Sequence, residues 1–273
     1  MPRKPAFISH SREREAEIQA RLLAVLEARF RRRIAQEIAR EMGAILATYQ
    51  ASEVIPPVSE QHAQNMRAIY ADLALRSALV FGRRIISQGK AVTPDLESKE
   101  EGFFTRLYRS LASAWVNLEP VRRRIQSVTE TTRNGIVREV ETGQRDGLGI
   151  DAIARGISDN VPSIARMRAA LIARTETHGA ANFASYNTAL QTGLDLRKEW
   201  VSVIDMRTRS FGENDEFDHL AMDGQTVAMD EPFLMPWRKG PPIPAMYPGE
   251  ASLPPGACIN CRCAVVYTVD GLD

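Results

Sequence analysis

The sequence predicts an α+β protein with a mainly helical N-terminal part, built from long amphipathic helices, and a smaller α+β C-terminal domain. Two observations predict this fold. Apolar residues recur every three or four positions through most of the first 190 residues, which is the period of an amphipathic helix. Beyond residue 195, two short runs rich in β-branched residues enclose a long stretch rich in proline, glycine and aspartate, which is typical of strands and turns.

The longest helix is predicted to end before Pro56-Pro57, because proline removes a backbone donor. Its apolar stripe consists of Ile18, Leu22, Val25, Leu26, Phe30, Ile34, Ile38, Met42, Ile45 and Tyr49. The stripe follows no strict heptad, so packing against neighbouring helices or another protein is favoured over an isolated coiled coil. A second helix is predicted from residue 66 to about Gly89, and residues 90–99 are expected to form a polar loop.

Further helices are predicted at residues 103–118 and 121–140, with Pro120 at the junction between them. Glycines at positions 143, 147 and 149 then interrupt the helical period. A short helix is expected at residues 150–157, and Pro162 is expected to open another that runs towards Leu190. The glycines mark the predicted boundary between a helical region at residues 1–145 and a C-terminal domain at residues 146–273.

The C-terminal domain is expected to hold two strands around an irregular region. Residues 196–205 include Trp200 and Val201 and favour a strand, and residues 264–269 favour a second strand that closes the chain. Residues 206–257 lie between them and are predicted to form a long, well-packed region with little regular structure.

Composition excludes several classes of protein. The chain has 273 residues and a formal net charge of +1, so overall charge indicates neither a nucleic-acid nor a membrane partner. No stretch reaches the roughly 20 apolar residues of a membrane-spanning helix. The three cysteines all lie between positions 258 and 263, which argues against a secreted disulfide framework and indicates a protein that stays in the cytoplasm where it is made.

Two arginine runs stand out against this balanced charge. They are Arg31, Arg32 and Arg33 in the first helix, and Arg122, Arg123 and Arg124 in the fourth. Such runs could contact DNA phosphates or an acidic partner, while the plainer interpretation is a solvated helix face.

Four short segments occur in order along the C-terminal half. They are Ala173-Arg174-Thr175-Glu176-Thr177, then Trp200 with Asp205-Met206-Arg207-Thr208-Arg209, then His219 with Gly224, and finally Tyr247-Pro248-Gly249 with Asn260-Cys261-Arg262-Cys263. Taken together, this set resembles the Mu F-like head-morphogenesis family of tailed phages. The segment between Arg209 and His219 is longer than that family's pattern leads us to expect, and Cys258 is additional to its usual two cysteines.

The resemblance implies a minor structural protein of the virion, located in the head at the portal vertex and made in the host bacterial cytoplasm. It implies binding to the portal protein, with the major capsid protein, scaffold and packaged DNA as further candidate partners, and no membrane. It also implies that the protein is not an enzyme. The region at residues 1–145 is assigned to portal or capsid docking by association with this family.

The cysteine cluster leaves two interpretations open. Cys258, Cys261 and Cys263 place three thiols on one loop, and His219 is the natural fourth ligand for a tetrahedral structural Zn²⁺ ion. Such an ion would tie the irregular region to the closing strand. The alternative is three reduced, buried thiols, since free cysteine is among the most buried residue types.

The charged motif residues also leave alternatives. The structural hypothesis is a buried ionic cluster of Glu176, Asp205, Arg207 and Arg209, with both arginines on one side of a strand end. The catalytic hypothesis is a nuclease or ADP-ribosyltransferase-like toxin domain that uses Arg174, Glu176, Arg207 and His219 in an open cleft. A third alternative is a non-specific DNA-binding protein that uses the two arginine runs.

Overall fold

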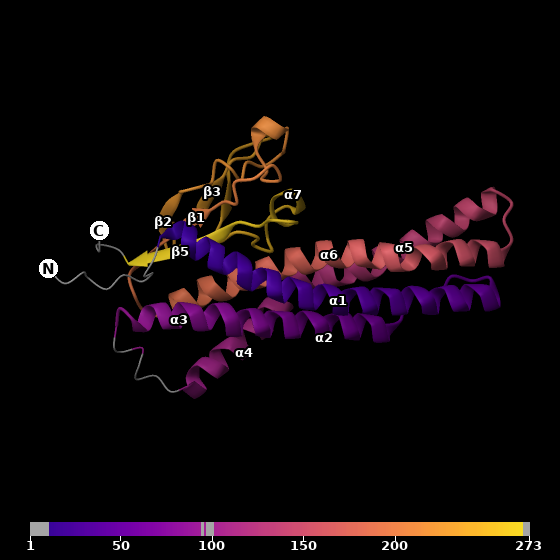
Figure 1. Cartoon of the computed structure of the whole chain (residues 1–273), viewed down its shortest axis with the longest axis horizontal. Coiled ribbons are helices and arrows are strands. Elements are labelled where there is room, and N and C mark those ends of the chain that lie inside the picture. The colour runs from indigo at the N-terminus through magenta and orange to yellow at the C-terminus, as the bar shows by residue number, and fades with distance from the viewer. Residues whose placement is uncertain (1–10, 94–95, 97–100, 270–273) are drawn as a thin grey trace. The chain divides into compact units, whose positions relative to one another are not determined.

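The computed structural model describes residues 11–93, 96 and 101–269, and it confirms the α+β class with long helices before two small antiparallel sheets. Half of the loop predicted at residues 90–99 lies outside the described residues. The helices are α1 (Arg12–Ser52), α2 (Glu60–Ser77), α3 (Arg83–Lys90), α4 (Glu101–Asn117), α5 (Glu119–Arg145), α6 (Ile150–Leu190) and the short α7 (Pro255–Cys258) (Figure 1). None of the described helices has the length and hydropathy that a membrane span requires.

The chain divides into two compact units, each assembled from separated stretches of sequence. One, here called the sheet unit, consists of Met1–Leu26, Leu73–Trp115 and Arg174–Asp273. The other, here called the helical unit, consists of Glu27–Asp72 and Val116–Ala173. Helices α1, α2 and α6 contribute residues to both units. The functional division expected at residue 145 falls at the end of α5 and stays a prediction.

The helical unit is held by apolar stripes on four helices that run side by side (Figure 1). Residues spaced three or four apart point inward, as the sequence pattern predicts. Its buried apolar residues include Phe30, Ile34, Ile38, Met42, Tyr49, Met66, Tyr70, Val121, Ile136, Val140, Ile157 and Val161. Arg33 also pairs with Asp72 and so joins α1 to α2.

A buried polar network fixes the connection between α1 and α2. The Glu37 carboxylate lies 2.8 Å from His62 Nδ1 and accepts hydrogen bonds from Arg40 and Asn65. Glu41 accepts from the backbone N–H and hydroxyl of Ser59, the residue before α2. Burial opposes ionisation of Glu37, but the three hydrogen bonds outweigh it and hold the pKa of this carboxyl below its ordinary value. The network therefore gives the carboxylates of Glu37 and Glu41 the hydrogen-bond partners that the apolar residues of α1 cannot provide.

One helix prediction is wrong in a single respect: Pro162 does not start a helix but lies inside α6. The stripe of Ile153, Ile157, Val161, Ala165 and Ala169 stays buried at a constant spacing on both sides of the proline. Pro162 and Ser158 are both exposed, so the carbonyl that loses its helical donor can bind water. Apolar packing on the opposite face therefore carries the helix through the proline.

The sheet unit contains β1 (Leu196–Val201), β2 (Thr226–Ala228) and β5 (Ala264–Val269) in the antiparallel order β2-β1-β5. A second pair joins β3 (Phe233–Met235) to β4 (Ile243–Ala245). The closing strand at 264–269 is confirmed, and the region between 206 and 257 is irregular apart from these short strands and α7. The strand predicted to reach residue 205 ends at Val201, for a reason given with the site below.

The start of α1 is tied to the sheet unit by ion pairs. Arg12 donates to Glu199 on β1 at 2.7 Å and to Asp223 at 2.7 Å. One turn later, the buried Glu15 accepts from Arg84 on α3 at 2.7 Å and from Gln19 at 3.1 Å. Gln19 also donates to the carbonyl of Val265 on β5, which caps part of the sheet edge.

A π-helical turn at Ala78–Gly82 joins α2 to α3 and requires a glycine at its end. A Cβ atom on Gly82 would lie 2.5 Å from the ring of Tyr108 on α4. Glycine therefore lets α4 approach this turn closely, where Ala78, Phe104 and Tyr108 form a small core.

Lys198 on β1 is fully buried, which is unusual for lysine. Its ammonium donates to the carbonyl of Met246 at 3.0 Å and lies over the rings of Tyr186 and Phe233 at 4.8 and 5.1 Å. Burial lowers the pKa of Lys198 to about 8, against partial compensation by Glu250. Burial in the sheet unit therefore disfavours the charged form of Lys198.

The lowered pKa of Lys198 should make the free energy of unfolding depend on pH. Because the folded pKa of about 8 lies below the ordinary value of 10.5, the unfolded chain binds more protons between these values, and stability rises with pH across that window. Replacing Lys198 with methionine should remove this rise, on the order of 3 kcal/mol. The measurement is urea unfolding of wild type and Lys198→Met at pH 7 and pH 10.

The exposed Lys239 offers a matched control, since its side chain is 68% exposed. Lys239→Met should keep the wild-type pH dependence. Equal pH dependence of Lys198→Met and wild type would contradict a buried charged lysine.

Candidate functional site

Segments from four parts of the chain meet in the sheet unit around the loop at residues 259–263. Thr175 on α6 accepts a hydrogen bond from the Asn260 N–H at 3.0 Å, and Arg174 donates to the Asn260 side chain at 3.1 Å. Asn260 has a φ of +63°, a left-handed conformation that asparagine tolerates better than most residues. Two neighbouring residues of α6 therefore hydrogen-bond to the residue at which this loop adopts the left-handed conformation.

The Tyr247-Pro248-Gly249 turn packs on the same helix. The Asn182 side-chain amide donates to the Pro248 carbonyl at 2.9 Å and to the Cys263 carbonyl at 3.3 Å. A Cβ on Gly179 would lie 3.1 Å from the Gly249 carbonyl, and Gly249 itself has a φ of +71°. Sequence reasoning identified the turn but missed Asn182 and Gly179, because nothing in their spacing indicates a partner some 70 residues away.

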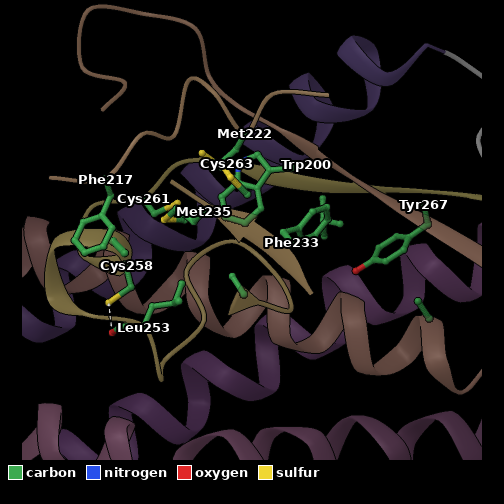
Figure 2. Close-up of a cluster of buried hydrophobic side chains, with 14 of the residues drawn as sticks. Trp200, Phe217, Met222, Phe233, Met235, Leu253, Cys258, Cys261, Cys263 and Tyr267 are labelled. Carbon is green, nitrogen blue, oxygen red and sulfur yellow. Dashed lines mark hydrogen bonds between the residues drawn. The ribbon is translucent and has the colours of Figure 1, made fainter. Parts of the chain in front are cut away.

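His219 and two cysteines of this loop, Cys261 and Cys263, form a buried triad. His219 Nδ1 lies 3.7 Å from Cys261 Sγ and 3.5 Å from Cys263 Sγ, and all three residues are at most 3% exposed. Figure 2 shows Cys263 beside Trp200 and Cys261 beside Met235, within the apolar core of the sheet unit. The Trp200 ring meets the His219 ring edge to face at 6.1 Å. This is the group of potential metal ligands that the described residues form.

Cys258 lies apart from this triad, which corrects the predicted four-ligand set. Its thiol points towards the Leu253 carbonyl, 3.6 Å away, as the dashed line in Figure 2 shows. The reason is local: the short helix α7 ends at Cys258 and turns its side chain into the core beside Phe217 and Leu253. The sequence spacing of three cysteines on one loop could not reveal this turn.

The two thiols of the triad influence each other's protonation. The pKa of Cys263 is lowered, chiefly because its sulfur accepts a hydrogen bond from Cys261, and His219 acts in the same direction. The pKa of Cys261 is raised, chiefly by that same bond and then by burial. Cys263 is therefore the sulfur that carries negative charge first.

The backbone around His219 explains how the long segment after Arg209 is accommodated. The Arg209 carbonyl accepts from the backbone N–H groups of His219 and Leu220, at 2.9 and 3.1 Å. Residues 210–218 therefore form a closed loop that returns the chain to its starting point. The Ser202 hydroxyl donates to the His219 carbonyl at 2.5 Å and fixes the residue further.

Asp205 sits in a turn and not at a strand end, so the predicted alternation of Arg207 and Arg209 does not apply. Its carboxylate accepts from the Arg207 N–H at 2.9 Å within this turn. Strand β1 stops at Val201 because the next backbone N–H, that of Ser202, donates to the Asp223 carboxylate at 2.9 Å instead of to a neighbouring strand. The Asp205 carboxylate also accepts two hydrogen bonds from Arg262, both at 2.6 Å. This bidentate pair holds the pKa of Asp205 well below its ordinary value.

The predicted buried ionic cluster is wrong in composition and burial. Asp205 and Arg207 are exposed, and Asp205 pairs with Arg262, a residue the hypothesis left out. Arg209 donates to the Ile259 carbonyl at 2.5 Å instead. Glu176 is buried on α6, only 2% exposed.

The catalytic hypothesis requires one cleft shared by Arg174, Glu176, Arg207 and His219. Glu176 and His219 are both 2% exposed, whereas Arg174 is half-buried and Arg207 is exposed. A cavity of about 20 Å³ is lined by Arg207, His219, Cys261 and Cys263, among other residues. A separate cavity of about 320 Å³ is lined by Arg174 and Arg207 but not by His219. Each cavity therefore holds only part of the predicted set.

The arginine runs lie in the helical unit. Arg31 and Arg32 are exposed, while Arg33 is half-buried, pairs with Asp72 and lies over the Phe30 ring at 5.5 Å. Arg122 and Arg123 are exposed and line a groove of about 920 Å³ that also holds Arg67, Arg133 and three glutamates. Arg124 is half-buried. Four of the six arginines are therefore exposed, which both a solvated helix face and a contact surface require.

Comparison with known proteins gives three relatives. The chain is 29% identical to minor head protein GP7 of Bacillus phage SPP1 over half of its own length and 41% of the relative. It is 28% identical to the NAD(+)–arginine ADP-ribosyltransferase EFV of Enterococcus faecalis over 60% of its own length and 31% of the relative. It is 23% identical to the uncharacterized protein YqbB of Bacillus subtilis over 60% of its own length and 51% of the relative. No solved structure matches the chain.

The chain thus spans about a third to a half of the length of these curated relatives. Residues 134–266 match the family described as phage Mu protein F like protein. This region contains the triad, the Asp205 turn, the Tyr247-Pro248-Gly249 turn and all of α6. The match and the ordered motifs together show that residues 134–266 of this chain belong to the phage Mu protein F-like family.

Proposed function

We propose that this chain is a minor structural protein of a tailed-phage head, bound near the portal, that aids head assembly and DNA packaging or delivery. One observation carries the proposal: the family match over residues 134–266 coincides with the interlocked segments of the sheet unit. The similarity to a minor head protein supports it over the same part of the chain. The helical unit, with its long exposed helix faces, is the proposed docking element for the portal or capsid.

We further propose that the protein acts by binding and not by catalysis. Glu176 and His219 are buried, whereas Arg174 is half-buried and Arg207 is exposed. Neither of the two cavities lined by members of this set holds all four residues. The relative named as an ADP-ribosyltransferase is matched over 31% of its length, so its activity belongs to that protein. Nuclease and transferase activities are the alternative that assays on particles must address.

Particle incorporation tests the head proposal. The tagged full chain, expressed in phage-infected cells, should co-purify with procapsids and with mature heads, together with portal protein. A charge reversal at the exposed Arg122 and Arg123 (Arg122→Glu, Arg123→Glu) should reduce incorporation several-fold if the helical unit docks there. Immunoblots of gradient-purified particles provide the measurement.

The exposed arginines Arg155 and Arg166 on α6 supply the matched control, since their reversal leaves the groove intact. Recovery of the chain only as free protein, absent from both kinds of particle, would sink the head proposal. Assays for cleavage or modification of nucleic acid and protein would then come first.

We also propose a structural zinc ion at His219, Cys261 and Cys263. In tetrahedral zinc sites the metal lies about 2.3 Å from sulfur and about 2.0 Å from nitrogen, so a nitrogen and a sulfur ligand are separated by about 3.6 Å. The observed separations of 3.7 and 3.5 Å match this value. The adjoining cavity of about 20 Å³ has room for a single atom or water, which supports a bound ion or a fourth ligand from solvent.

Metal content of the purified chain tests this site. We expect about one Zn²⁺ per chain in wild type and in Cys258→Ser, and at least a tenfold loss in Cys261→Ser and in His219→Asn. A chelator should also lower the melting temperature of wild type, because zinc binds only the folded site. Elemental analysis and thermal melts give these values.

Cys258→Ser is the matched control, because it removes a buried thiol outside the triad. Equal zinc content in all variants would exclude the triad as the site. Loss of zinc from Cys258→Ser as well as from the triad variants would restore the four-ligand set predicted from the sequence.

Packaged DNA is the remaining proposed partner, through the two arginine runs. The full chain should bind duplex DNA at low salt, and the affinity should fall steeply with salt. Arg122→Gln with Arg123→Gln should reduce the slope of log K against log salt by about 2, because each lost phosphate contact removes about one unit. Unchanged slopes, or no binding at low salt, would remove DNA from the list of partners.

A further inference from the structure

A polar cavity opens on the sheet unit beside the Asp205 turn. It has a volume of about 320 Å³, and the residues that define it here, as the arginine pocket, are Arg174, Met206, Arg207, Arg209, Asn260 and Arg262. They come from α6, from the turn that follows β1 and from the loop before β5. Three of the motif segments that carry the family resemblance therefore converge on one surface cavity.

Two of the pocket arginines, Arg207 and Arg209, keep their charge largely available for a ligand, whereas Arg262 is neutralised by Asp205. Arg262 is fixed by its bidentate bond to Asp205, and Arg209 by its bond to the Ile259 carbonyl. Arg207 is 71% exposed, and its closest Asp205 oxygen is 3.8 Å away, beyond hydrogen-bond distance. Among the described residues, Arg209 contacts a carbonyl and no carboxylate. Two guanidinium groups are therefore positioned to receive an oxyanion from outside.

Two exposed apolar side chains lie beside these arginines. Met206 is 99% exposed and Ile204 is 70% exposed, on the same turn as Arg207. Single exposed apolar residues are ordinary, but two within three residues, next to several arginines, have the composition of an interface centre. This combination fits a partner that brings both acidic and apolar side chains.

The residues that line the arginine pocket favour a protein partner over a nucleic acid. Glu213 and Asp215 line the same cavity, and Asp205 lies at its edge, so a continuous phosphate chain would meet three carboxylates. Among the described residues that line the cavity, none is aromatic, so bases would find no stacking surface. A peptide can place separate carboxylates on Arg207 and Arg209 while its apolar side chains cover Met206.

We propose that the arginine pocket docks an acidic, partly apolar segment of a partner protein. Carboxylates of the segment pair with Arg207 and Arg209, and its apolar side chains pack on Met206 and Ile204. This partner would be another protein of the phage head, and only that assignment rests on the proposed function. Binding is tested on the isolated full chain, so its failure leaves the particle result unaffected.

Fluorescence anisotropy with defined probes tests the docking. The probes are a twelve-residue peptide of alternating glutamate and leucine, the same peptide with glutamine for glutamate, and a twelve-nucleotide single-stranded DNA. The glutamate peptide should bind at least about tenfold more tightly than the other two, with affinity that falls as salt rises.

Variants on the exposed turn locate the binding without disturbing the core. Arg207→Gln and Met206→Ser should each weaken binding of the glutamate peptide about fivefold or more, while Arg155→Gln on α6 should leave it unchanged. Unchanged circular dichroism and melting temperature confirm that the variants fold. Arg209→Gln, which also loses its bond to Ile259, serves as a second variant.

Three outcomes would overturn the proposal. The first is absence of glutamate-peptide binding at low salt, and the second is equal binding by Arg207→Gln, Met206→Ser and wild type. The third is tighter binding of the DNA probe with the same dependence on Arg207, which would assign the pocket to nucleic acid.

Discussion

The sheet unit depends on one constraint: segments more than 60 residues apart must meet around the loop at residues 259–263. The Asn182 amide satisfies two carbonyls at once, one in the Tyr247-Pro248-Gly249 turn and one at Cys263. Because both carbonyls are buried with it, losing this amide would leave acceptors without partners, at a cost of about 1–3 kcal/mol each. The close approach of Gly179 to Gly249 makes these bonds possible.

Around this junction, several buried polar side chains have partners that suit them. Lys198 has a carbonyl and two aromatic faces, Glu15 has Arg84, and Cys261 and Cys263 have His219. Each arrangement limits the free energy lost when a polar group leaves water. The sheets are small, so these contacts, more than regular strand pairing, define the conformation of residues 202–263.

The exposed side of the same junction has a different character. The Asp205 turn places Arg207, Met206 and Ile204 in solvent, while the Arg262 fork beneath holds the turn in shape. A rigid base under exposed arginine and apolar side chains is a suitable arrangement for recognition, because little conformational entropy is lost on binding. Structural and binding roles can therefore belong to the same motif residues, with the buried members supporting the exposed ones.

The sequence by itself determined the helices, the closing strand and the family. Helical period depends on local spacing, so the stripe from Ile18 to Tyr49 predicted α1, and Ala264–Val269 predicted β5. Only the tertiary structure decided how Pro162 is tolerated, why β1 ends at Val201, and that Cys258 lies away from His219. These outcomes depend on apolar packing across α6, on the bond from Ser202 to the Asp223 side chain and on the turn at α7. Such contacts join residues whose partners are set by the folded chain, and a pattern along the sequence does not contain them.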